Sequence, residues 1–310
     1  MTTQTEVCYS VLRILKPLRY QGKLFKKEVK KDNMKIGYGT YAMQTKNIFD
    51  ALPRLREIGY EAIEISTGDD WHTAPHKFDR SSRQKLVKTL QDLAFESPVT
   101  MALLPICTLG NRRSAILEKF DAACVLASDL NYSDGPSILV STLGGIKGGW
   151  DIIKNIICAQ LIELGDRAAK HNVILAVEPH AGQPLDTPQK VDWIMKQTNH
   201  DHIKINFDIS HFHVDGFDLK TSVDLCAPYT VSTHIKDGAR VDGKVHYQLP
   251  GEGTLDLVKY FRLVSEAGIT IPITVEITGQ IWNLPDYDPW TVAKQCFKSL
   301  NKARRQAGVL

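Results

Sequence analysis

The chain has 310 residues, of which 43% are hydrophobic and 24% charged, and its formal net charge is +3. This composition is typical of a soluble globular protein and excludes a disordered chain or a collagen-like fibre. The longest apolar runs, such as residues 99–110, are shorter than the roughly 20 residues that a membrane-spanning helix needs, so we expect no membrane partner. The six cysteines are scattered and form no CxxC pair, which favours a reducing compartment and a cytoplasmic protein.

The first 33 residues differ in charge from the rest of the chain. They contain eight lysines and arginines against three acids, a net charge of +5, which leaves residues 34–310 at −2. A sequence-independent nucleic-acid binder needs a dense basic surface, and the body of the chain lacks one, so we expect no nucleic-acid partner. Residues 1–33 lack the pattern of a secretory signal, whereas a mitochondrial presequence stays open. We predict a basic, partly disordered extension at 1–33 and a catalytic domain at 34–310.

From residue 34 onward, short β-branched runs alternate with longer amphipathic segments. The predicted strands are 35–42, 61–67, 99–106, 137–144, 173–180, 202–210, 231–237 and 272–279. The predicted helices are 46–58, 80–96, 111–131, 150–171, 187–199, a short one near 218–228, 254–267 and 290–306. This alternation is typical of parallel α/β architecture, in which each strand is followed by a helix that returns the chain to the sheet.

Eight such rounds predict an α/β fold of the (β/α)8 TIM-barrel type. An open doubly wound sheet is the alternative, but it usually carries a glycine-rich first turn. The first turn here, residues 38–47, has no GxGxxG motif. The glycine-rich segment at 144–149 lacks the Lys-Ser/Thr ending of a phosphate-binding loop, so we interpret it as a barrel loop.

Ionisable residues concentrate near the ends of the last four predicted strands. They are Glu178 and His180, Asp208, His211 and His213, His234, Lys236 and Asp237, and Glu276. The carboxyl ends of all strands in a barrel reach the same rim, so these groups are expected to meet there although the sequence separates them. That rim is where barrel enzymes carry their active sites.

Four of these residues, Glu178, Asp208, His234 and Glu276, come from four successive strands. Three carboxylates that lie close together without a cation would repel one another, and a bound divalent metal removes that conflict. Three oxygen donors and one imidazole suit Mn²⁺, Mg²⁺ or Co²⁺, whereas Zn²⁺ is less favoured because no thiolate is present. The second ring nitrogen of His234 needs an acceptor to fix its tautomer, and the sequence does not identify that acceptor.

Six short motifs occur in order on the predicted strands and loops. They are GYEAIEI (59–65), VEPHAG (177–182), FDISH (207–211), THIKDG (233–238), PGEGTLD (250–256) and VEITG (275–279). Together they resemble the xylose isomerase-like TIM-barrel superfamily, in particular its sugar phosphate isomerase/epimerase family with the ketose 3-epimerases, and inosose dehydratases nearby. The resemblance covers about residues 34–310.

The resemblance implies specific roles for several residues. Glu178, Asp208, His234 and Glu276 match the metal ligands of that superfamily. His211 matches a histidine that contacts substrate hydroxyls, and Arg240 matches a substrate-binding arginine of the 3-epimerases. The chain departs from the epimerase pattern at Pro184, where that group carries a second glutamate.

Three further residues are candidates for binding substrate. Trp71 follows the second strand and is placed to stack against a sugar. His180 lies two residues after Glu178, and Lys236 two residues after His234. The expected partner of the site is a small-molecule sugar, and a homo-oligomer is compatible with the sequence.

The chemistry of the predicted site favours proton transfer next to a carbonyl. Glu178 and Glu276 are placed to act as base and acid on opposite faces of a sugar, while a metal stabilises the enediolate. We therefore predict a divalent-metal-dependent sugar or cyclitol epimerase or isomerase. The alternative is a dehydratase, a lyase that removes water from a keto-sugar or inosose on the same metal site.

Two other classes are weighed against these enzymes. The superfamily includes a trinuclear zinc AP endonuclease, which needs histidines after strands two and three, where this chain reads EIST and LLPICTLG. Its Asp-x-His pair appears here only as Lys244-Val245-His246. A non-catalytic barrel is the remaining alternative, because a fold alone does not imply an activity.

Overall fold

The computed structural model describes residues 33–144 and 146–310. The predicted extension at 1–33 therefore lies, except for its last residue, outside the described residues. Its separation from the catalytic domain and its partial disorder remain predictions.

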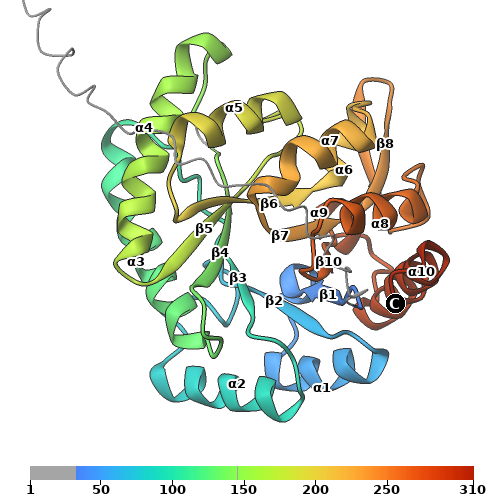
Figure 1. Cartoon of the computed structure of the whole chain (residues 1–310). Helices are drawn as coiled ribbons and strands as arrows, with labels where there is room; N and C mark the ends of the chain where they lie inside the picture. Colours follow the sequence, from blue (N-terminus) through green and yellow to red (C-terminus); the bar gives the residue numbers. More distant parts are fainter. Residues whose placement is uncertain (1–32, 145) are drawn as a thin grey trace, which may run out of the picture. The chain divides into compact units, whose positions relative to one another are not determined.

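Eight parallel strands of the described chain close into a barrel in the order β1-β10-β7-β6-β5-β4-β3-β2 (Figure 1). Their bounds are β1 Ile36–Gly39, β2 Ala62–Ser66, β3 Val99–Met101, β4 Ser137–Thr142, β5 Val173–Glu178, β6 Ile203–Asp208, β7 Thr230–Ile235 and β10 Ile273–Val275. Each lies within or next to one of the predicted strands, and the structure confirms the (β/α)8 TIM barrel. The observed strands are shorter than predicted because several apolar runs continue into the loops at the rim.

Helices surround the strands on the outside of the barrel (Figure 1). They are α1 Ile48–Ile58, α2 Arg80–Asp92, α3 Arg113–Leu130, α4 Trp150–Ala169, α5 Pro188–Thr198, α7 Leu219–Cys226, α8 Leu257–Glu266 and α10 Pro289–Ala307. Side-chain caps fix several of their beginnings, since Asp79 accepts from the backbone N–H of Ser82 and Thr187 from that of Lys190. Their apolar faces pack on the strands to form the main hydrophobic core.

Several short elements were not predicted. Helix α6 (Ile209–Val214) begins directly after Asp208, where the sequence pattern predicted that strand six continues to 210. An antiparallel hairpin, β8 (Asp237–Val241) with β9 (Lys244–Gln248), follows β7, and α9 (Gly279–Trp282) follows β10. Three 3₁₀ turns complete the described chain: η1 Thr40–Met43, η2 Gly110–Arg112 and η3 Ala227–Tyr229. Most of these elements lie in the loops that follow strands, where they shape the rim.

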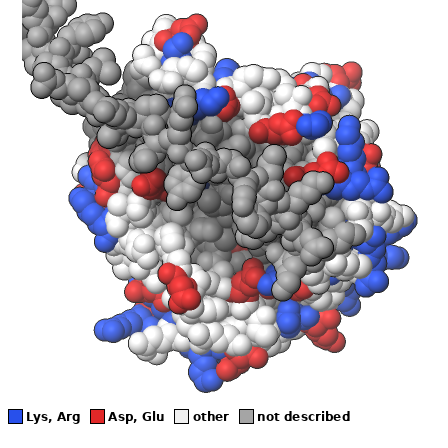
Figure 2. Space-filling model, in the orientation of Figure 1, with Lys and Arg blue, Asp and Glu red and all other residues white. Residues whose placement is uncertain are grey.

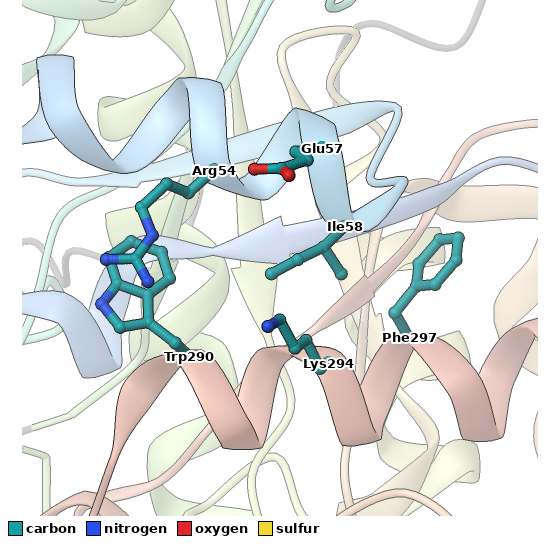
Figure 3. Close-up of a pocket in the computed structure, with 6 residues that line it drawn as sticks. All are labelled: Arg54, Glu57, Ile58, Trp290, Lys294 and Phe297. Carbon is teal, nitrogen blue, oxygen red and sulfur yellow. The ribbon is translucent and has the colours of Figure 1, made fainter.

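The outer surface of the barrel carries mixed charge. Figure 2 shows acidic and basic side chains intermixed on the part of this face that is not drawn in grey. Between α1 and α10 lies a cavity of about 240 Å³, in which the Arg54 guanidinium stands 3.8 Å from the centre of the Trp290 ring (Figure 3). Across residues 33–144 and 146–310, no helix combines the length and the apolar character needed to cross a bilayer.

Candidate metal centre

Four buried side chains at the carboxyl ends of neighbouring strands form what we call the donor cluster: Glu178, Asp208, His234 and Glu276. One ligand atom of each lies within 4.8 Å of the corresponding atoms of the other three. Glu178 ends β5, Asp208 ends β6, His234 lies in β7, and Glu276 follows β10 directly. The parallel register explains the convergence.

Backbone pairing fixes the height of these residues on the barrel. Asp208 and His234 are register partners on β6 and β7, and the N–H of Glu276 donates to the carbonyl of Ile235 at 3.1 Å. The Asp208 carboxylate also accepts from the N–H of Ser210 at 2.8 Å, which caps α6. A side chain held by its own strand and by a cap needs little reorganisation to bind a ligand.

The imidazole of His234 is held between two carboxylates. Its Nδ1 lies 3.0 Å from Glu178 Oε1, and its Nε2 lies 2.8 Å from Oε2 of Glu64, a buried residue of β2. Burial opposes the charged form of His234, but Glu64, Glu178 and Glu276 outweigh it and raise its pKa well above the usual value. Burial in turn raises the pKa of Glu64.

Glu64 is therefore the acceptor that the sequence could not identify. It belongs to the GYEAIEI motif, and a glutamate inside an otherwise apolar buried strand was the available signal for it. By holding Nε2, it leaves Nδ1 of His234 facing the carboxylates of the cluster.

Lys236 lies in the same cluster and is almost completely buried. Its ammonium contacts the carboxylates of Asp208 and Glu276 and lies 3.3 Å from Nε2 of His211. Burial would lower the pKa of Lys236, but Asp208 and Glu276 raise it well above the usual value. Despite burial, the cations Lys236 and His234 lower the pKa of Glu276, and Asp208 likewise has a lowered pKa. The carboxylates of Asp208 and Glu276 are thus ionised and paired with a cation.

The chemistry of the donor cluster fits a divalent ion. Three carboxylates and one imidazole supply the oxygen-rich, thiolate-free set that hard or borderline ions prefer. The ammonium of Lys236 already contacts two of these carboxylates, so an ion that binds all four groups would replace those two contacts.

The two other predicted histidines flank the cluster. His180 and His211 have ring centres 3.8 Å apart, and His211 Nε2 lies 3.6 Å from Asp208. The hydroxyl of Tyr247, on the β8–β9 hairpin, forms a hydrogen bond with Nδ1 of His211 at 2.6 Å. Burial, with the nearby ammonium of Lys236, lowers the pKa of His211 well below its usual value, so this ring is neutral. Tyr247 carried no signal in the sequence, because the hairpin itself was not predicted.

A cavity of about 360 Å³ opens above the cluster. Its lining includes Glu178, His180, Lys236 and Glu276 from the prediction, together with Tyr41, Met101, Ala102, Leu103, Ser141, Thr142, Tyr247, Thr278, Gly279 and Gln280. We call it the catalytic cavity, in the sense of the function proposed below.

Two predicted substrate contacts lie elsewhere. Among the described residues, Trp71 is outside the lining of this cavity and stacks on Tyr41, with ring centres 5.4 Å apart. Arg240 lies on β8 and pairs with Asp215, and it also donates to the carbonyl of Gly243 at 2.7 Å. Trp71 therefore lies behind Tyr41, whose ring lines the cavity, and does not line the cavity itself. Arg240 is likewise outside the cavity lining.

Asp237 shapes the loop that carries the PGEGTLD motif. Its buried carboxylate accepts from the N–H groups of Gly238, Gly251 and Leu255 at 2.8, 3.1 and 3.0 Å. Gly253 packs so closely that a Cβ there would lie 2.2 Å from Asp237 Oδ1, so only glycine fits. This contact holds the loop against the base of the hairpin that carries Tyr247.

Comparison with known proteins gives a family and a group of structural neighbours. The model of the family described as "Xylose isomerase-like TIM barrel" matches residues 52–300. The inosose dehydratase of Lacticaseibacillus casei is 26% identical over an alignment of 131 residues, and the match covers 37% of this chain and 44% of that protein. The match thus spans less than half the length of this curated relative.

Solved structures resemble the chain in fold. A structure of L-ribulose 3-epimerase superposes with a TM-score of 0.70 at 19% identity, over 89% of this chain and 97% of that chain. A xylose isomerase-like TIM-barrel protein from Mycobacterium smegmatis, in complex with magnesium, gives a TM-score of 0.67 at 16% identity, over 90% and 99%. At these identities the likeness concerns the fold.

Proposed function

Since the chain belongs to the xylose isomerase-like TIM-barrel family, we propose that it is a divalent-metal-dependent epimerase or isomerase of a sugar or cyclitol. The observation that carries this proposal is the donor cluster, which combines three carboxylates and one imidazole within 4.8 Å at the carboxyl ends of four strands. Active sites of TIM barrels lie at this rim.

The geometry of the two glutamates supports proton transfer. In the barrel order, β6 and β7 separate β5 from β10, so Glu178 and Glu276 approach the catalytic cavity from two sides of Asp208 and His234. Both line the cavity. We assign them to remove and return a proton on the carbon next to a substrate carbonyl, one on each face of the sugar.

The neighbouring polar groups suit the recognition of hydroxyls. His180 and Tyr247 line the cavity, and neutral His211 is held in orientation by Tyr247. Lys236 offers an ammonium to a substrate oxygen once its carboxylate partners are engaged elsewhere. When bound to the donor cluster, Mn²⁺, Mg²⁺ or Co²⁺ supplies a Lewis acid that polarises the substrate carbonyl.

A dehydratase is the second candidate, and two observations favour it. The curated relative is named inosose dehydratase. In addition, Pro184 stands where the ketose 3-epimerases that the sequence resembles carry a second glutamate. After the base removes the proton next to the carbonyl, the acid can protonate the hydroxyl on the following carbon, which then leaves as water. The product then has the mass of the substrate less one water.

The test is solvent-proton exchange. Purified protein is loaded with Mn²⁺ and incubated in deuterated water with free ketoses, keto-glycosides and inososes. We expect deuterium in the product of at least one substrate and about one bound ion per barrel by metal analysis. Absence of exchange and of a mass loss across all three classes would refute the proposal, and three bound zinc ions would point to nuclease chemistry instead.

A further inference from the structure

An apolar groove of about 1060 Å³ lies beside the catalytic cavity. It runs between the loop that follows β2 and the exposed side of α3. Its apolar walls include Trp71, Leu103, Ile116, Ala122 and Val125. None of the roles assigned above uses this space.

The groove and the catalytic cavity share a wall. Ala102 and Leu103, directly after β3, line both. On the same boundary, Tyr41 lines the catalytic cavity and Trp71 lines the groove, and their rings stack at an interplanar angle of 21°. The two spaces are therefore neighbours that meet at Ala102 and Leu103.

The surface of the groove is suited to an apolar ligand. Leu103 and Val125 both line the groove and are 39% and 40% exposed, so they offer apolar surface to a ligand. Five charged residues also line the groove: Asp69, Asp70, Arg83, Glu118 and Lys119. Lys119 pairs with Asp69 and Arg83 with Asp129, while Asp70 and Glu118 form no ion pair among the described residues. Most of the surface that the groove offers is nevertheless aliphatic or aromatic.

Size distinguishes the two spaces. Ligand sites are typically about 300–1,000 Å³, and the catalytic cavity, at about 360 Å³, lies at the small end of that range. It is suited to one sugar or cyclitol ring, with little room for a large group attached to it. Such a group can extend past Leu103 into the groove.

We propose that the substrate is a substituted keto-sugar, a glycoside whose apolar, aromatic-sized group lies in the groove while its ring lies at the donor cluster. This inference rests on the proposed function, because it assigns the reacting ring to the catalytic cavity. The shared wall favours such a substituent over a second protein chain, since one ligand can occupy both spaces.

The experiment compares the methyl and phenyl glycosides of the same keto-hexose, as substrates in the exchange assay and as ligands of the Mn²⁺-loaded protein by calorimetry. We expect the phenyl glycoside to have a kcat/KM at least about 10-fold higher, the low end of what a single methylene changes in an apolar pocket. Val125→Glu places a charge in the groove and should remove that advantage. Ser128→Glu, on an exposed part of the same helix outside the groove lining, should keep it.

The outcomes separate the two proposals. Equal kcat/KM values for both glycosides, unchanged by Val125→Glu, would overturn the groove inference and leave the proposed function intact. If neither glycoside exchanges deuterium, the proposed function is at fault, and calorimetry still decides whether the phenyl group binds and whether Val125→Glu weakens it. Sedimentation of both variants provides the last check, because dissociation of an oligomer by Val125→Glu alone would make the groove a contact between copies of the chain and overturn the inference.

Discussion

Two parts of the same barrel rim differ sharply in how they use burial. Around β5, β6, β7 and β10, the donor cluster and Lys236 bury at least five ionisable groups against one another. Around β2, β3 and α3, the apolar groove exposes aliphatic side chains, and the charged residues that line it form no buried cluster among the described residues.

This difference suits the two regions of the rim to different roles. Charges removed from water interact strongly because little solvent screens them, but each is costly to bury without a partner. The donor-cluster side therefore suits bond-making chemistry that depends on a few exact positions. The groove side offers apolar surface area, which suits recognition of apolar groups.

The largest effect is expected on the charged side, from a change that keeps shape and removes charge. Glu276→Gln should lower the rate of deuterium exchange by about 10²–10⁴-fold, the usual contribution of a positioned acid or base. Unchanged circular dichroism checks that the barrel is intact. Retention of normal exchange in this variant would contradict the role assigned to Glu276.

The next largest effect is expected on the unfolding free energy of the metal-free protein, when the buried ammonium of Lys236 is removed. Lys236→Met leaves Asp208 and Glu276 without their cation, and breaking a buried pair in this way costs about 3–5 kcal/mol of unfolding free energy. Mn²⁺ should recover much of the loss and bind more tightly than to the wild type, because it no longer displaces the ammonium. Urea titration with and without Mn²⁺ measures both effects. Lys204→Met, on β6 and outside the donor cluster, is the control. Weaker Mn²⁺ binding in Lys236→Met would be evidence against this competition.

Glu64 provides a finer test of the charged side. Glu64→Gln removes the carboxylate that holds His234 Nε2, and loss of such a partner typically weakens metal binding by about 10–100-fold. Calorimetric titration with Mn²⁺ measures the change. Glu61→Gln, which affects the pair with Arg304 just before β2, is the matched control and should bind Mn²⁺ as the wild type does. Equal affinities for the two variants would remove Glu64 from the metal site.

The smallest effect is expected at His72, next to Trp71 of the groove, and concerns the pH dependence of the unfolding free energy. His72 accepts a hydrogen bond from the N–H of Ile48 at 3.1 Å, so its neutral form is needed. Burial, and then Lys77, lower the pKa of His72, opposite to the direction for His234. The unfolded chain therefore takes up the proton first as pH falls below about 6.5, and the stabilisation from His72 is lost on the acid side.

The measurement is the unfolding free energy at pH 7.5 and pH 5.5. Wild type should lose more stability than His72→Gln on acidification, by no more than about 1 kcal/mol, the size of one hydrogen bond. An equal loss in both proteins would show that the contact with Ile48 contributes nothing.

The sequence predicted correctly those features that depend on a single strand, such as the position of a strand or of a residue at its end. Period and β-branched runs placed all eight barrel strands, and the ionisable residues at their ends predicted that Glu178, Asp208, His234 and Glu276 would meet. Their role as metal ligands stays a prediction. The sequence did not predict the short elements in the loops. These include α6, whose beginning is capped by the Asp208 carboxylate through the N–H of Ser210, and the β8–β9 hairpin.

By itself, then, the sequence determined the barrel and the membership of the donor cluster, because both follow from local periodicity and from the rule that parallel strands end at one rim. Only the tertiary structure decided which side chains contact one another. It showed that His234 meets Glu64, 170 positions away in the chain, that Lys236 points inward to Asp208 and Glu276, and that Trp71 lies behind Tyr41. Such contacts depend on side-chain direction and on the packing of distant segments, and no local pattern in one sequence encodes them.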